Sequence, residues 1–307
     1  MKTTKILKSL MMATVLTLLV IYTLVTPVFA AYTTTVNLGN ATSFAVLAGS
    51  TVTNTGSTTL SGTAGNNLGV SAGTEVTGTG SFTMIGGVIY TGEAENAVNA
   101  QTALTAAYTD AASRTPNTVL ASPELGGLTL VSGIYSATTL AITGTLTLDA
   151  ENDPTSVFIF QSGSTLVTAN NSNIVLANGA NACNIFWVVG SSATLGTSST
   201  LYGHVLAQES ITATTGATIY GSLLARIGAV TLDTNTIVNN ACTTPVVTPP
   251  VTPPVETPVE TPVVTPVETT TPSPLPATSS PLDFIFMIGG TLVLIGAAGW
   301  AFKKKSV

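Results

Sequence analysis

The sequence predicts an all-β solenoid with one helix, and three observations support this: a short threonine-rich repeat, apolar strands at the same spacing, and a single helical segment. The repeat consists of ATLGTSSTLYG (193–203), ITATTGATIYG (211–221) and VTLDTNTIVNN (230–240). The first two superpose at a spacing of 18 residues, and the third follows after a one-residue slip. A coil this short cannot bury its own apolar side, so successive coils must stack on one another.

Nearly continuous apolar strands lie between the repeats, at residues 184–190, 204–209 and 222–227. Such runs are typical of parallel strands that are covered on both faces. Residues 93–114 can supply the cover, because alanine, leucine and tyrosine recur there at helical spacing without glycine or proline. We therefore expect one long helix against one side of the solenoid, with further coils before and after it in the sequence.

The two ends of the folded region predict export on a stalk. Residues 1–30 combine early lysines with an apolar stretch and end in Val28-Phe29-Ala30, which is the pattern of a secretory signal peptide. Residues 243–274 are rich in proline, threonine and valine, and repeated proline favours an extended, semi-rigid chain. The folded domain is therefore expected at residues 31–242.

Residues 275–307 resemble a Gram-positive cell-wall sorting signal, L-P-x-T-G followed by an apolar segment and a basic tail. The motif position is occupied by Leu275-Pro276-Ala277-Thr278-Ser279, an uncharged apolar run follows at 284–302, and then come three lysines. An apolar run of this length can cross a bilayer, with the lysines on the cytoplasmic side. Serine replaces the glycine of the motif, which leaves two outcomes open: cleavage after Thr278 and attachment to the cell wall, or retention as a membrane anchor. Either outcome displays the domain at the cell surface.

The charge of the domain excludes one class of partner. No lysine lies between residues 9 and 302, and only Arg114 and Arg226 are strongly basic there, against ten carboxylates from residue 32 to residue 242. Proteins that bind nucleic acids cluster Lys and Arg to neutralise phosphates. Nucleic acid is therefore not an expected partner.

Cysteine, histidine and the acidic turn are the remaining candidate sites. Cys183 and Cys242 are the only cysteines, and in an exported domain we expect them to form a disulfide that ties the last coil back to an earlier one, with two buried free thiols as the alternative. His204 is the only histidine and has no nucleophile partner, so a core or edge role is favoured. The carboxylates of the turn DAENDP (149–154) are read as turn formers, because a calcium site needs several more oxygen ligands; no metal or cofactor is expected.

Several long segments carry a family resemblance. They are LGNATSFAVLAGSTVTNTG (38–56), GIYSATTLAITGTLTLDAENDPTSVFIFQSGSTL (133–166) and ACNIFWVVGSSATLG (182–196) with the repeats that follow. In this order they resemble the ice-binding domain of the DUF3494 type over residues 35–242. The resemblance implies a right-handed, three-sided parallel β-helix whose first and last coils are separated in sequence by one long helix along the axis. It also implies a protein that binds the surface of ice and inhibits recrystallisation, produces thermal hysteresis or holds the cell at ice; we expect a monomeric domain.

Threonine suits such a role, because one stiff β-branched side chain presents both a methyl and a hydroxyl group. Ice-active members of the family carry patterns such as T-A/G-x-T/N, which match residues 168–171, 212–215 and 215–218; residues 194–197 and 231–234 keep the threonines but place leucine second. Strand alternation also places Asp233 outward, where a hydrated carboxylate weakens contact with ice. The expected ice-binding residues, on one flat face rich in Thr, Ser and Ala, are Thr168, Asn171, Thr194, Thr197, Thr200, Thr212, Thr214, Thr215, Thr218, Thr231, Thr234 and Thr236.

Two other functions are weighed against ice binding. An enzymatic solenoid such as a polysaccharide lyase or hydrolase requires paired carboxylates or basic groups that converge on a cleft, and the repeats carry almost none, so catalysis is not expected. The alternative is a surface-anchored adhesin that binds a glycan or another surface without ice activity. In that case the threonines would serve only strand formation and solubility.

Overall fold

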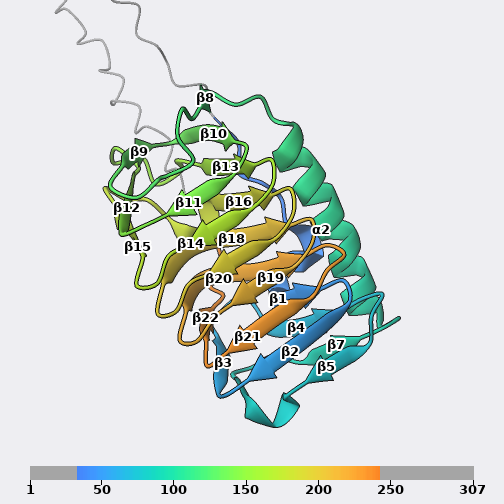
Figure 1. The fold of residues 1–307 in the computed structure, drawn as a ribbon. Coiled ribbons are helices and arrows are strands. Elements are labelled where there is room, and N and C mark those ends of the chain that lie inside the picture. The colour runs from blue at the N-terminus through green and yellow to red at the C-terminus, as the bar shows by residue number, and fades with distance from the viewer. Residues whose placement is uncertain (1–32, 243–307) are drawn as a thin grey trace, which may run out of the picture. The chain divides into compact units, whose positions relative to one another are not determined.

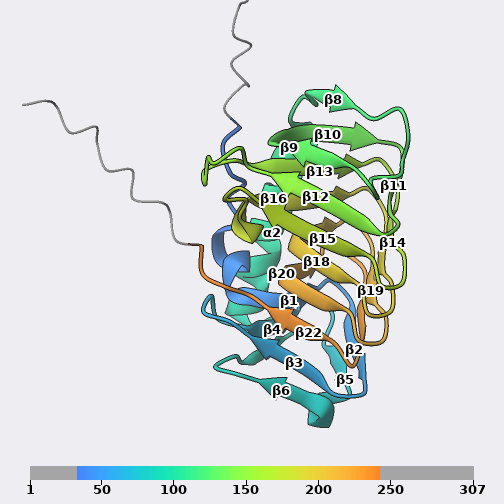
Figure 2. The same ribbon diagram turned by 90° about the vertical axis from the view of Figure 1, so that its left-hand side faces the viewer.

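The computed structural model describes residues 33–242, which form a parallel β-solenoid with three sides and one α-helix (Figures 1 and 2). The predicted fold class is therefore confirmed. The predictions for residues 1–30, 243–274 and 275–307 lie outside the described residues. Within the described part of the chain, the one long helix is not apolar enough to cross a membrane.

The covered face is the side of the solenoid that packs against the helix. Along the stack its strands are β8 (Thr118–Val119), β10 (Gly133–Ala137), β13 (Phe158–Ser162), β16 (Ile185–Val189), the second halves of β18 (Thr200–Ala207) and β20 (Thr218–Ala225), β1 (Phe44–Ala48), β4 (Asn67–Val70) and β7 (Ile89–Thr91). The helix α2 (Glu95–Ser113) lies on them and buries Ala97, Ala100, Leu104, Ala107 and Ala111. Small alanines let the helix approach the sheet closely, which agrees with the helix predicted at residues 93–114.

The other two sides face solvent. We call the seven-stranded sheet the first open face; its strands are β11 (Leu140–Ile142), β14 (Leu166–Thr168), β17 (Ala193–Leu195), β19 (Ile211–Ala213), β21 (Val230–Asp233), β2 (Thr51–Thr55) and β5 (Glu75–Thr77). The second open face consists of β9 (Thr129–Val131), β12 (Thr145–Asp149), β15 (Asn173–Ala177), the first halves of β18 and β20, β22 (Thr236–Val238), β3 (Thr58–Ser61) and β6 (Phe82–Met84). Short 3-10 helices occupy Gly39–Ser43 (η1), Thr79–Ser81 (η2) and Ala182–Asn184 (η3).

The order of the coils in space differs from their order in the sequence. The first coils stack on the last ones, because β1 pairs with β20, β2 with β21 and β3 with β22. Helix α2 then carries the chain back along the stack to β8 at the far end (Figure 1). Its 19 residues span about 28 Å at 1.5 Å per residue, which is close to the depth of six stacked strands. The discontinuous coil order implied by the family resemblance is thus confirmed.

Glycine marks the bend between the second open face and the covered face. Strands β18 and β20 run across this corner without interruption, and Gly203 and Gly221 occupy the bend with φ angles of 106° and 152°. A β-carbon on Gly221 would lie 2.0 Å from the carbonyl oxygen of Gly203 in the next coil. This close approach explains why the two threonine-rich repeats share a glycine at the same position.

The interior of the solenoid is a column of stacked apolar side chains. Near one end the ring of Phe160 lies between two others, 5.4 Å from the ring of Tyr135 and 4.2 Å from that of Trp187. Trp187 is fully buried and satisfies its indole N–H by donating to the carbonyl of Tyr202 at 2.9 Å. Outside the column, Cys183 and Cys242 form the predicted disulfide, with 5.5 Å between their Cα atoms, so the alternative of two free thiols was wrong.

Candidate functional site

Five threonines form the central ladder of the first open face. In the sheet register Thr194 pairs with Thr212, Thr212 with Thr231, Thr231 with Thr53, and Thr53 with Thr77. Their neighbours on each strand point into the core, as Leu195 and Ala213 do, so the threonines point outward. Within residues 33–242 none of the five hydroxyls makes a side-chain hydrogen bond. The ladder therefore presents a row of hydroxyls that only water or an external ligand can satisfy.

Small side chains surround this ladder. Along the stack it continues through Val167, which pairs with Thr194 and is 46% exposed, and then through Ala141. The outward row two residues earlier and the row two residues later contain mostly Thr, Ser, Ala and Gly: Thr139, Thr165, Ser192, Ser210, Ala229 and Thr51 on one side, and Thr143, Ala169, Gly196, Thr214, Asp233 and Thr55 on the other. Apart from Glu75 and Glu124 at the two ends of the sheet, no aromatic or long side chain stands in these three rows.

Carboxylates mark the two ends of the face. Glu75 pairs with Thr51 at one end, and Glu124 bridges to Ala141 at the other. Burial alone would raise the pKa of Glu124, but the backbone N–H groups of Thr143 and Gly126 donate to its carboxylate and hold the pKa below its usual value. Glu124 therefore acts as a charged cap on the first strand of this sheet, away from the threonine ladder.

The corner between the two open faces holds a hydrogen-bonded cluster. The carboxylate of Asp233 accepts hydrogen bonds from the hydroxyls of Thr215 at 2.5 Å and Thr234 at 2.9 Å. In the next coil the Thr214 hydroxyl donates to the Leu195 carbonyl at 2.8 Å. It also lies 3.3 Å from the hydroxyl of Thr197. Asp233 points outward, as predicted, but both of its oxygens are engaged by threonines, so its charge is less available to solvent than its position on the strand indicates.

The prediction for Thr168 was wrong. Thr168 is only 4% exposed, and its hydroxyl accepts the backbone N–H of Gly196 at 2.9 Å in the interior. The register explains the error, because Val167, not Thr168, pairs with Thr194, and a slip of one residue moves a side chain to the opposite face. Asn171 is exposed but lies in the corner turn with a φ of 58°, not on the flat part of the face.

The prediction of a single face was also wrong, because Thr200, Thr218 and Thr236 lie on the second open face. There they belong to a second ladder in which each side chain pairs with the next: Thr145, Asn173, Thr200, Thr218, Thr236, Thr59 and Thr83. The six threonine hydroxyls make no hydrogen bond among the described residues. A three-sided coil turns a corner after each short strand, so residues six apart in one repeat fall on different sides.

The second open face differs from the first in the row beside its ladder. Tyr202 and Tyr220 stand there as a stacked pair with ring centroids 4.6 Å apart, flanked by Val175 and Val238. These rings project further than threonine does. The first open face is therefore the flatter of the two, and the second offers one narrow ladder along its edge.

Sequence reasoning missed Thr145 and Asn173 of the second ladder. It also missed four ladder positions nearer the N-terminus, namely Thr53, Thr77, Thr59 and Thr83. They belong to the first coils, which are more than 150 residues from the last coils in the sequence but stack directly on them. The alternation in TVTNT (51–55) was an available signal, since it places Thr51, Thr53 and Thr55 on one side of a strand.

The remaining candidates have structural roles. His204 is 3% exposed, its ring stacks on Phe186 at 5.6 Å, and its Nδ1 lies 2.8 Å from the hydroxyl of Ser222. Burial lowers its pKa to about 4, so the ring is neutral near pH 7, in agreement with the predicted core role. Asp149 accepts hydrogen bonds from the Glu151 backbone and the Asn178 side chain, which lower its pKa and close the acidic turn. Among residues 33–242 no group of three or more His, Cys, Asp or Glu is placed to hold a metal ion.

Comparisons with known proteins agree with this geometry. The family model described as Ice-binding-like matches residues 46–238. An ice-binding protein of Nostoc sp. (strain HG1) is 45% identical over 209 residues, which cover 67% of this chain and 75% of that protein. The crystal structure of an ice-binding protein from an Antarctic biological consortium has a TM-score of 0.65 at 43% identity, over 70% of this chain and 95% of that one. That of the Antarctic ascomycete Antarctomyces psychrotrophicus has a TM-score of 0.64 at 39% identity, over 68% of this chain and 100% of that one.

Proposed function

The chain belongs to the Ice-binding-like family, and from that premise we propose that it is a non-catalytic protein that adsorbs to ice through the first open face. The observation that carries the proposal is the central ladder, Thr194, Thr212, Thr231, Thr53 and Thr77, whose hydroxyls have no partner within residues 33–242. Adsorption in turn would inhibit recrystallisation, produce thermal hysteresis or hold the cell at ice.

The geometry of the face suits a crystalline ligand. Neighbouring strands are about 4.8 Å apart, and outward side chains two residues apart on one strand are separated by roughly 6.5 to 7 Å, so the three rows form a regular two-dimensional grid. Each threonine holds its methyl and hydroxyl in a restricted rotamer, and the stacked core behind it keeps the strand in place. Water ordered over the methyls and bonded to the hydroxyls can then join the ice lattice with little loss of side-chain entropy.

We also propose a second, narrower contact on the second open face. Its ladder is at least as long as the first, and its threonine hydroxyls are equally unengaged among the described residues. Tyr202 and Tyr220 rise beside it, so a flat crystal surface can approach only along the edge next to the corner. We therefore expect this face to contribute less to adsorption than the first open face.

The predicted export signal, stalk and sorting-type segment support a further proposal, that the solenoid is displayed at the cell surface. A basic tail after an apolar run is typical of a segment held at the membrane, and the proline-rich stretch before it would keep the domain away from the envelope. In this arrangement the protein would attach a cell to ice.

Variants on the two open faces test the ice proposal. Thr212→Tyr/Thr231→Tyr places two large rings on the first ladder, and Thr218→Tyr/Thr236→Tyr does the same on the second. Thermal hysteresis measured on residues 31–242, with circular dichroism to confirm folding, should fall to near zero for the first pair and by a smaller part for the second. A first-face variant with wild-type hysteresis would contradict the proposal. No hysteresis or ice shaping in the wild type would instead favour an adhesin for another surface.

A further inference from the structure

We propose that the Cys183–Cys242 disulfide moves the point at which pulling force enters the solenoid, from its last strand, β22, to β16, the strand that follows Cys183. The inference depends on the proposed attachment through the C-terminal segment, because only then does the chain beyond Cys242 carry load. Its consequence is that the threonine ladders stay intact while the protein is pulled from its C-terminal side.

Detaching the last coil would damage the solenoid, because this coil lies inside the stack and joins the last coils to the first ones. Strand β22 pairs with β20 on one side and with β3 of the first coils on the other (Figure 2). It is only three residues long. After it, the Asn239 side chain donates to the Thr42 carbonyl at 2.9 Å, and the backbone N–H of Ala241 donates to the Thr63 hydroxyl at 2.9 Å. Apart from the disulfide, hydrogen bonds of this kind are what hold residues 239–242 to the solenoid.

Load on an uncross-linked Cys242 would break these bonds one after another and then remove β22. Force would next reach β21, which pairs with β2 of the first coils. Two of the three strand pairings that join the first coils to the last, β22 with β3 and β21 with β2, would then be broken. Both ladders would break at that junction, between Thr236 and Thr59 on one face and between Thr231 and Thr53 on the other.

The disulfide directs the load to a much stronger element. Cys183 lies in η3, immediately before β16, and all five residues of β16 are buried. This strand pairs along its whole length with β13, and from Phe186 to Val189 with β18. Trp187 of the same strand is anchored by ring stacking on Phe160 and by its hydrogen bond to Tyr202. Force at this point must displace a fully buried five-residue strand rather than the three-residue strand β22.

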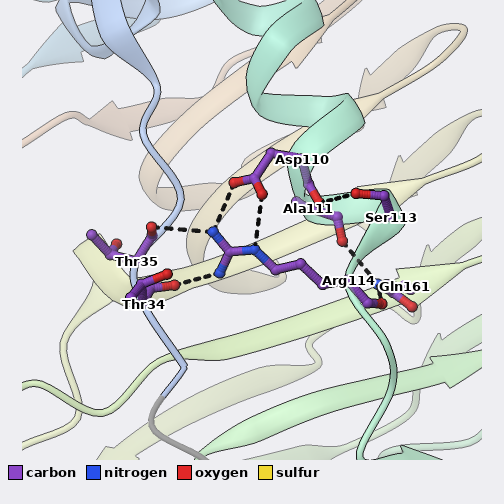
Figure 3. Close-up of polar contacts among 7 residues, drawn as sticks. All are labelled: Thr34, Thr35, Asp110, Ala111, Ser113, Arg114 and Gln161. Carbon is purple, nitrogen blue, oxygen red and sulfur yellow. Dashed lines mark hydrogen bonds and ion pairs between the residues drawn. The ribbon is translucent and has the colours of Figure 1, made fainter.

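The N-terminal end of the described chain is held differently. There the Arg114 guanidinium, at the end of α2, pairs with Asp110 at 2.7 Å and donates to the backbone carbonyls of Thr34 and Thr35 (Figure 3). The Gln161 side chain completes the cluster by donating to the carbonyls of Ala111 and Arg114, each at 2.8 Å. Among the described residues, the N-terminal segment is thus held by hydrogen bonds, whereas the C-terminal segment, which leads to the predicted stalk, is held by a disulfide.

Single-molecule force spectroscopy on the full chain, without ice, tests the inference. One handle is attached at Thr59 on β3 and the other at the C-terminus, and oxidised protein is compared with protein reduced after folding. The reduced protein should show an early rupture at lower force, with a gain in length of roughly 45 Å for residues 230–242 at about 3.5 Å per residue. The oxidised protein should show its first rupture at a higher force.

A second pulling geometry separates force routing from general stabilisation. With handles at Thr59 and Thr34, reduction of the disulfide should leave the first rupture force unchanged, because no load passes through Cys242. Equal first-rupture forces before and after reduction in the C-terminal geometry would overturn the proposal, and so would an equal loss of force in both geometries. Cys183→Ser/Cys242→Ser should behave like the reduced protein; because the comparison is already made on wild-type protein, it does not depend on that variant folding.

Discussion

Asp233 provides a prediction in which stability and ice binding change in opposite directions. Its carboxylate accepts hydrogen bonds from Thr215 and Thr234 at the corner beside the ice-contact face. Asp233→Ala removes both acceptors. Hydrogen bonds to a charged group contribute about 1.5 to 3 kcal/mol when they are well shielded, but both threonines are exposed and can turn to water. We therefore expect a loss of about 1 to 2 kcal/mol, which lowers Tm by roughly 2 to 8 °C for a domain of this size.

Asp233→Asn separates the charge from the hydrogen bonds. The amide keeps one acceptor oxygen, so about half of the stability loss should remain, while the charge at the edge of the face disappears. Thermal unfolding followed by circular dichroism measures the first effect, and the fraction of protein incorporated into growing ice measures the second, which should rise above wild type. Glu93→Gln, an exposed carboxylate just before α2, is the matched charge control and should change neither quantity. Wild-type Tm for Asp233→Ala would show that the two hydrogen bonds do not stabilise the corner, and reduced incorporation for Asp233→Asn would show that the charge does not weaken contact with ice.

Three further predictions address the ladder, the core and pH. Val167→Thr lengthens the first ladder by one hydroxyl at an exposed position, so incorporation into ice should rise while Tm stays within about 2 °C; a decrease in incorporation would contradict the grid. Trp187→Ala removes a fully buried ring and should cost about 3 to 5 kcal/mol in chemical denaturation; a loss below 1 kcal/mol would place the ring outside the core. His204 has a pKa lowered from 6.5 to about 4 in the folded protein, so the unfolded chain binds the proton first as the pH falls. The free energy of unfolding should therefore decrease by about 3 kcal/mol as the pH is lowered from 6.5 to 4. His204→Gln should remove that part of the pH dependence, and an unchanged pH profile in the variant would show that other groups cause it.

Local patterns in the sequence predicted the architecture well. The solenoid followed from the repeat, and the helix at 93–114 differs from α2 by one or two residues at each end, because alanines at helical spacing mark the buried side of a helix directly. The disulfide followed from the presence of two cysteines in an exported domain.

The composition of the site depended on three-dimensional information that local patterns lack. The coil that contains Thr168 is longer than the 18-residue repeat, so its register relative to Thr194 could be set only by the strand pairing itself. Thr53 and Thr77 joined the ladder because the first coils stack on the last, a relation between segments far apart in the sequence. Thr200 and Thr194 lie on different faces because the chain turns a corner between them. The alternation of residues within one strand does not predict where such a corner falls.

Ice-affinity partitioning of the solenoid, residues 31–242, tests the central claim most directly when the wild type is compared with Thr212→Tyr at the middle of the first ladder. Thr105→Tyr, at an exposed position of α2 on the opposite side, is the control. The wild type and the control should be enriched in growing ice, and Thr212→Tyr should remain in the liquid with its fold intact. Equal enrichment of all three proteins would place the ice contact on another surface, and exclusion of the wild type would contradict ice binding itself.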